Sequence, residues 1–196
     1  MTTTKINEIT HAVIGAAYSD MKSVPLLLSI LVCAVTSVGQ THFYLEESFK
    51  HPVRIPAGVV SLLNDEVGKA CSQETANGGT DVKAWFSASR ISVNDNRSAL
   101  ILQSSKDCLN GADNVWFWVF LKTAQGYRLV LTGGAISVDV LRSKTHGLRD
   151  IETNVATART NHMDIYKFNG SAYHARRCTE ATPVDAKPKR VPCRTR

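Results

Sequence analysis

Apolar and polar positions alternate along much of this chain, and the apolar positions are densest between residues 115 and 142. Residues 115–122 are apolar at both odd and even positions, with Trp116, Trp118 and Phe120 on one parity. A strand that is apolar on both faces is usually central in its sheet and covered on both sides. We therefore expect residues 115–122 to form a central strand of the fold.

The two segments that follow show the period of two that is typical of strands. Residues 127–132 come after a break that contains Gly126, and residues 135–142 come after Gly133-Gly134. Glycines of this kind favour turns because they adopt conformations that other residues avoid. The pattern predicts three consecutive antiparallel strands joined by short turns, which is a β-meander.

Upstream of this stretch the pattern predicts a helix and then a hairpin. Residues 55–70 carry apolar side chains at helical spacing, and Pro56 suits a first helical turn. The apolar face consists of Val59, Val60, Leu63, Val67 and Ala70. Residues 83–93 and 98–103 alternate around a polar turn at 94–97, which predicts two paired strands.

Downstream, the dipeptide Asn169-Gly170 separates two alternating segments and is a strong hairpin signal. A two-residue loop there would place Tyr166 opposite Tyr173, an aromatic pair of the kind that fixes register. From residue 179 the composition shifts to Pro, Lys and Arg. We predict that residues 179–196 form an irregular, solvated basic tail.

The beginning of the chain has the layout of a secretory signal peptide. Met21 and Lys22 precede an apolar run at 24–35, and small residues follow up to Gly39. We interpret residues 1–39 as a mis-assigned start plus a signal peptide, with translation beginning at Met21. An uncleaved signal anchor is the alternative, although the run is shorter than the roughly 20 residues that span a membrane. Residues 40–178 are then a single domain.

Export changes how the remaining cysteines are interpreted. Cys71, Cys108, Cys178 and Cys193 are an even number of cysteines in an oxidising compartment, so disulfides are expected. The absence of a CxxC pair and of histidines at zinc-finger spacing argues against a metal site. Three pairings are open, and we favour Cys71–Cys108 together with Cys178–Cys193.

The formal net charge of +6 is concentrated near the C-terminus, where residues 176–196 hold seven basic and two acidic side chains. Such a tail could contact an anionic surface, such as a membrane or a cell-wall polymer. Of the two interpretations, we favour a purely solubilising tail without a partner. Specific nucleic-acid binding is not expected, because no aromatic residue is interleaved with the basic ones.

Several short motifs resemble those of small secreted bacterial proteins of unassigned function. These proteins combine a helix and cysteine with an FG-GAP (integrin-α-like) hairpin, a "WVF … GY" strand pair, a "GxxDI" turn and a closing "Y+F+G … C" hairpin. The corresponding segments here are 91–102, 118–120 with 126–129, 147–151, and 166–173 with Cys178. The resemblance covers most of the chain after residue 39 and implies no activity.

One feature departs from the FG-GAP pattern. A calcium loop needs several acidic oxygens at alternate positions, whereas this loop has Asn94, Asp95 and Asn96, with Arg97 where glycine is expected. One carboxylate beside a guanidinium is a poor calcium site. We therefore interpret the loop as a turn, and we expect neither metal nor cofactor.

No catalytic motif such as GxSxG, HExxH or a P-loop occurs. The one cluster that could support catalysis is His146 with Asp150 and Asp139, where a general base would have a carboxylate to orient it. Turn and surface roles are the ordinary interpretation of these residues. His146, Arg149 and Asp150 form the candidate surface site.

Together these patterns predict an α+β domain, with one helix near the N-terminus packed on a mainly antiparallel β-meander sheet of about seven strands. We expect a secreted or periplasmic binding protein without catalytic activity. It would act on a protein partner in the envelope, for example as an inhibitor or immunity-like module, because stapled β domains hold their loops rigidly. The alternative is a hydrolase that uses His146 and Asp150.

Overall fold

The computed structural model describes residues 41–72, 81–111, 114–185 and 187–193. The predicted signal peptide and start site at residues 1–39 lie outside the described residues. Among the described residues, no helix is both long and apolar enough to cross a membrane.

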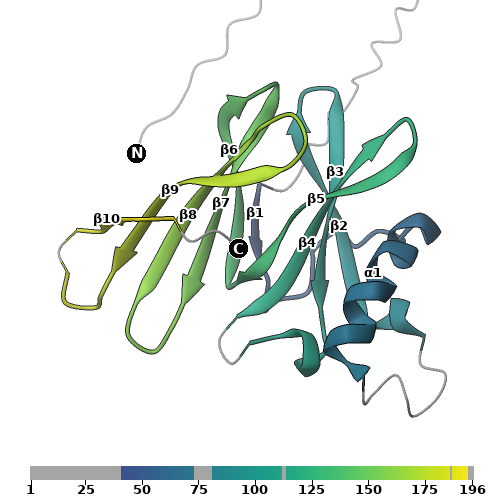
Figure 1. Ribbon diagram of the computed structural model, residues 1–196, viewed down its shortest axis with the longest axis horizontal. Helices are drawn as coiled ribbons and strands as arrows, with labels where there is room; N and C mark the ends of the chain where they lie inside the picture. The colour runs from purple at the N-terminus through teal and green to yellow at the C-terminus, as the bar shows by residue number, and fades with distance from the viewer. Residues whose placement is uncertain (1–40, 73–80, 112–113, 186, 194–196) are drawn as a thin grey trace, which may run out of the picture. The chain divides into compact units, whose positions relative to one another are not determined.

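The described residues form two antiparallel sheets and one α-helix (Figure 1). The strand order is β1-β6-β7-β8-β9-β10 in the six-stranded sheet and β2-β3-β4-β5 in the four-stranded sheet. The elements are β1 (His42–Tyr44), α1 (Ala57–Ala70), the 3-10 helix η1 (Val82–Trp85), β2 (Phe86–Asn94), β3 (Arg97–Ser104), the 3-10 helix η2 (Asp107–Leu109), β4 (Val115–Thr123), β5 (Gly126–Ala135), β6 (Ser137–Thr145), β7 (Leu148–Ala156), β8 (Asn161–Phe168), β9 (Tyr173–Ala181) and β10 (Lys189–Val191).

Strand β4 is central and covered on both faces, as its apolar pattern predicts. Phe117 and Val119 are buried in the core between the two sheets, which also contains residues of β6 and β7. Trp118 and Phe120 point to the opposite face and share a second core with helix α1. The odd-numbered side chains of β4 therefore pack in one core and the even-numbered side chains in the other. The four-stranded sheet is the middle layer.

The prediction of mainly antiparallel strands is confirmed, but the single sheet of about seven strands is wrong. Gly133 and Gly134 do not form a turn: they lie in β5, opposite Phe117 and Trp116. A Cβ on Gly134 would lie 3.4 Å from the Trp116 ring, so glycine leaves the indole its space. The chain then passes through Ile136 into the other sheet. The predicted meander is therefore split between two sheets.

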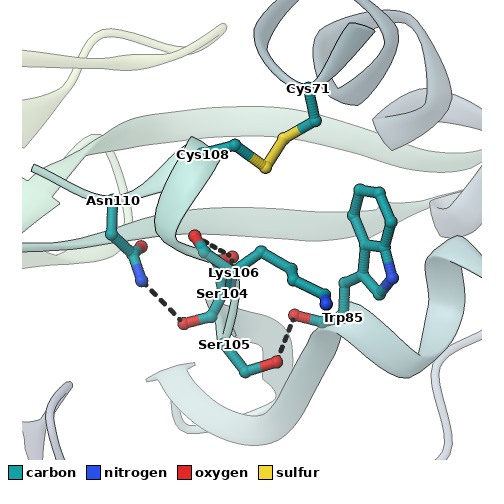
Figure 2. Close-up of a disulfide and its surroundings, with 7 residues drawn as sticks. All are labelled: Cys71, Trp85, Ser104, Ser105, Lys106, Cys108 and Asn110. Carbon is teal, nitrogen blue, oxygen red and sulfur yellow. Dashed lines mark hydrogen bonds between the residues drawn. A yellow bond between two sulfur atoms is a disulfide. The ribbon is translucent and has the colours of Figure 1, made fainter. Parts of the chain in front are cut away.

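Helix α1 fits the predicted segment, since its buried residues Val59, Leu63 and Val67 recur every four positions. The helix ends at a disulfide in which Cys71 bonds Cys108 of η2, with a Cα–Cα distance of 5.4 Å (Figure 2). This is the first of the two pairings favoured from the sequence.

The chain around Cys108 is fixed by its own polar contacts (Figure 2). The Ser105 hydroxyl donates to the Trp85 carbonyl at 3.1 Å, and the Asn110 amide donates to the Ser104 carbonyl at 3.4 Å. The Lys106 ammonium lies 5.3 Å from the centroid of the Trp85 ring, in cation–π range. These contacts hold Ser105, Lys106 and Asn110 beside η1 and the end of β3.

The closing hairpin forms, but its predicted register is wrong. Phe168, rather than Tyr166, pairs with Tyr173, and the loop has four residues. The side-chain oxygen of Asn169 accepts hydrogen bonds from the backbone N–H groups of Ser171 and Ala172, both at 2.9 Å. This Asx-type turn widens the loop by two residues, which a two-residue Asn-Gly turn would not do.

The described part of the predicted tail, residues 179–185 and 187–193, is more ordered than predicted. β9 continues to Ala181, β10 pairs with β9, and Cys178 bonds Cys193 as favoured from the sequence. Between them, Lys189 and Thr182 hydrogen-bond the Asp185 carboxylate and lower its pKa to about 2. A disulfide and a charged turn thus order a segment that has few apolar residues of its own.

Candidate functional site

A hollow of about 740 Å³ opens on the six-stranded sheet, lined by residues of β6, β7, β8 and β9. Asp150 of β7 lines it. Ile151 is buried in the core between the sheets. Since successive side chains of a strand point to opposite faces, Asp150 and the hollow lie on the sheet face away from that core.

Asp150 is the most buried charged residue of the hollow, with 2% of its surface exposed. The Ser143 hydroxyl donates to Oδ2 of Asp150 at 2.8 Å, and the Lys167 ammonium lies 3.9 Å from the same oxygen. The other oxygen, Oδ1, is buried and has no hydrogen-bond partner among the described residues. A buried carboxylate with half its hydrogen bonds unmade is costly for folding, and such groups concentrate at functional positions.

Basic side chains line the same hollow as this acid. Lys167 has 47% of its side chain exposed, and Arg176 and Arg177 are both exposed. Within the described part of the chain, neither arginine side chain has an ion-pair or hydrogen-bond partner. Three cations around one carboxylate give the hollow an excess of positive charge, which favours an anionic ligand.

A β-bulge brings both arginines to the hollow. On a regular strand, consecutive side chains point to opposite faces. Here Ile165 pairs with Arg177 while the next residue, Tyr166, pairs with Ala175, so Arg176 is an extra residue on β9. The bulge breaks the alternation and turns a second guanidinium toward the same hollow.

His146 reaches the hollow from the turn between β6 and β7. Thr145 pairs with Leu148, and the two residues between them, His146 and Gly147, have positive φ values of 49° and 78°. A two-residue hairpin of type I′ requires positive φ at both positions. The turn thus accounts for the unusual backbone of His146, and it leaves the side chain exposed at the mouth of the hollow.

Arg149, the third residue of the predicted surface site, points elsewhere. One terminal nitrogen of its guanidinium lies 3.7 Å from Oδ1 of Asp95, in the turn between β2 and β3. Its carbonyl accepts a hydrogen bond from the Tyr173 hydroxyl at 2.8 Å. Burial and, to a smaller extent, the charge of Asp150 raise the pKa of the Tyr173 phenol well above its ordinary range. Arg149 is therefore a structural residue beside the hollow.

Asp139 does not join His146 and Asp150 as the catalytic hypothesis required. It lies six residues before the end of β6, which at the rise of a strand is roughly 20 Å. Asp139 instead pairs across the strands with His42, whose Nδ1 lies 2.5 Å from the carboxylate. The structure thus brings together His146 and Asp150 but neither Arg149 nor Asp139.

The turn between β2 and β3 supports the same region. Asn94 donates from its side-chain amide to the Gly147 carbonyl at 3.3 Å, and Asp95 accepts from Lys144 at 2.8 Å. The Lys144 ammonium lowers the pKa of the Asp95 carboxyl, with a smaller contribution from Arg149. Among the described residues, no group of three or more His, Cys, Asp or Glu side chains is placed to hold a metal ion.

Sequence reasoning missed the residues that define the hollow, namely Ser143, Lys167, Arg176 and Arg177. The charge of Arg176 and Arg177 was counted with that of the basic tail, and regular alternation on a strand would point the two side chains to opposite faces. A sequence signal for Lys167 existed, since it lies on the predicted hairpin next to the strand that carries Asp150. No protein-family model, curated protein or solved structure matches the chain.

Proposed function

We propose that this chain is an exported, disulfide-bonded binding protein of the periplasm or cell surface, and that it acts without catalysis through the hollow around Asp150. The observation that carries the proposal is that Lys167, Arg176 and Arg177 line one hollow together with a buried carboxylate. Exposed cations held by a bulged strand suit recognition of an acidic partner, because their charge both attracts the partner and fixes its orientation.

Export is supported by the disulfides. Each of the cysteines at 71, 108, 178 and 193 is in a disulfide, and such bonds persist in oxidising compartments. The signal-peptide pattern at 21–39 and the resemblance to small secreted proteins agree with this location. The exposed side chains of Lys187 and Arg190 would favour an anionic envelope surface near the partner.

Binding is favoured over hydrolysis by the hydrogen bonds in the hollow. A hydrolase of this type needs a nucleophile next to a base, and the base next to a carboxylate. Ser143 donates directly to Asp150, and within the described residues no hydrogen bond joins His146 to Ser143 or to Asp150. Ser143 is thus arranged to satisfy a buried acid rather than to attack a substrate.

The proposal is tested by isolating the oxidised protein from the envelope fraction together with whatever co-purifies. Wild type and Arg177→Gln are compared, with Arg90→Gln, an exposed arginine of β2, as the matched control. We expect a stoichiometric partner that is lost only with Arg177→Gln. In parallel, esterase, glycosidase and peptidase assays compare wild type with His146→Ala. Turnover that falls by about a hundredfold in the variant would establish the hydrolase instead.

A further inference from the structure

We propose that the hollow binds a carboxylate on an apolar body, with the carboxylate against Arg176 and Arg177 and the body against Leu141 and Ile165. This inference rests on the proposed binding function and adds the chemistry of the ligand. The carboxylate could belong to a free small molecule or to the C-terminus of a partner chain, since both present the same group.

The anionic end of the ligand is assigned by the arginines. A guanidinium presents paired N–H donors that match the two oxygens of a carboxylate. Neither Arg176 nor Arg177 has a partner among the described residues, and the bulge at Arg176 places both at one hollow. Unpaired arginines at a common hollow can engage one carboxylate without first breaking an ion pair.

The apolar body is assigned by the walls. Leu141 is half-buried and Ile165 has 7% of its surface exposed, and both line the hollow. Ligand sites are typically hollows of about 300–1,000 Å³ that combine apolar walls with a few polar groups. The hollow of about 740 Å³ is in this range, so it can hold a phenyl or branched alkyl group beside the charged end.

A monoanion fits better than a dianion such as phosphate. The buried Asp150 already engages Lys167 at 3.9 Å and repels further negative charge. Phosphate sites also commonly use backbone N–H groups at a helix N-terminus. The described α-helix, α1, packs on the four-stranded sheet and contributes no residue to this hollow.

The test uses the full oxidised chain and follows amide shifts by NMR during titration. The probes are 3-phenylpropionate, its neutral amide, inorganic phosphate, and a short peptide ending in phenylalanine with either a free or an amidated C-terminus. We expect the two carboxylate probes, 3-phenylpropionate and the free-acid peptide, to shift the backbone amide signals of the protein around residues 141–150 and 165–177. The neutral amide of 3-phenylpropionate and the peptide with an amidated C-terminus should each bind about tenfold more weakly than the corresponding acid, as the loss of one charge-assisted hydrogen bond predicts.

Variants assign the arginines. Arg176→Gln and Arg177→Gln should each weaken carboxylate binding about tenfold, while Arg90→Gln should leave it unchanged. Equal affinities of acid and amide, phosphate binding more tightly than either carboxylate, or unaltered affinity in both arginine variants would overturn the inference. The inference would also be overturned if no amide signal shifted at about 10 mM probe. That concentration is well above a Kd of roughly 1 mM, which corresponds to a weak binding free energy of about 4 kcal/mol.

The two carboxylate probes identify the source. Tighter binding of the free-acid peptide than of 3-phenylpropionate supports the C-terminus of a partner chain, and the reverse order supports a free small molecule. A partner that is lost with Arg177→Gln, while none of the carboxylate probes binds, would refute this inference and leave the binding function standing. A carboxylate that is bound and then chemically converted would refute the binding function and leave the ligand class standing.

Discussion

Nζ of Lys144 lies 2.8 Å from Oδ2 of Asp95, and this ion pair joins the two sheets at their hairpin tips. Lys144 is at the end of β6, and Asp95 is in the turn between β2 and β3. A second link joins the sheets here, because the Asn94 side-chain amide donates a hydrogen bond to the carbonyl of Gly147, in the turn between β6 and β7. The turn that presents His146 is therefore held by the opposite sheet as well as by its own hairpin.

Replacement of Lys144 by glutamine should return the pKa of Asp95 toward its ordinary value, because the ammonium is the main group that lowers it. A lowered carboxyl pKa stabilises the fold above the unfolded pKa of about 3.9, and this stability is lost as pH falls through the folded value. Wild type and Lys144→Gln should thus differ slightly at neutral pH and converge in acid. Carboxyl NMR titration and urea unfolding measure both effects.

Lys122→Gln is the matched control, because Lys122 is exposed on β4 and has no ion-pair partner in the described chain. Its unfolding should keep the wild-type dependence on pH. High salt should shrink the effect of Lys144→Gln, since exposed charges are screened. An Asp95 pKa that is the same in wild type and in Lys144→Gln would contradict the assignment.

Replacement of Tyr173 by phenylalanine removes the hydrogen bond to the Arg149 carbonyl and should cost about 1 kcal/mol at neutral pH. It should also change the alkaline limb of the stability curve. Above about pH 10 the unfolded phenol ionises while the buried folded phenol does not, so the free energy of unfolding falls as pH rises. Wild type should lose stability in this range more steeply than Tyr173→Phe does. Parallel slopes would show that Tyr173 is not protected from ionisation.

Replacement of Ser143 by alanine leaves the buried Asp150 carboxylate without its closest donor. We expect a loss of about 1–3 kcal/mol in the free energy of unfolding, the cost of an unsatisfied buried polar group. Ser98→Ala, at an exposed position on β3, is the control and should change stability by less than about 0.5 kcal/mol. Chemical denaturation of both variants at pH 7 makes the comparison. Equal effects would mean that Asp150 does not depend on Ser143.

The two disulfides should differ in their contributions. They join residues 37 and 15 positions apart, and loop-closure entropy predicts losses of about 4 kcal/mol for the Cys71→Ser/Cys108→Ser double variant and about 3 kcal/mol for Cys178→Ser/Cys193→Ser. Non-reducing peptide mapping of the envelope protein should recover these two pairs. Free thiols in that material, or the other pairings, would contradict both the pairing and the location.

Local patterns in the sequence were enough to predict the elements whose cause is local. The two apolar parities of β4 indicate two cores, and the four-residue spacing from Val59 to Val67 indicates α1. For the disulfides, the sequence left three pairings open, and the favoured one is the pairing in the structure. These features depend on residues near each other in the chain, or on the few pairings that four cysteines allow.

Features set by tertiary contacts were not predictable in this way. Gly133-Gly134 has the composition of a turn, but it lies in β5, where Gly134 leaves space for the Trp116 ring across the strand. Arg176 belongs to the hollow because of a one-residue bulge, and bulges leave no clear mark in hydrophobic alternation. Arg149 is near His146 in the sequence and was predicted to share a surface site with it. Its guanidinium instead lies beside the Asp95 carboxylate, which is more than fifty positions away in the chain.

The pairing of β1 with β6 has a consequence for the order in which the molecule folds. His42 meets Asp139 across 97 positions of sequence, whereas β2, β3 and β4 pair with their immediate neighbours in the chain. Closing a long loop costs entropy before any contact repays it, so distant pairings form late. Among the described strands, β1 should therefore be the last to dock. Pulse-labelled hydrogen exchange should find the amides of β3 and β4 protected before those of β1, and simultaneous protection would show that the two sheets form in one step.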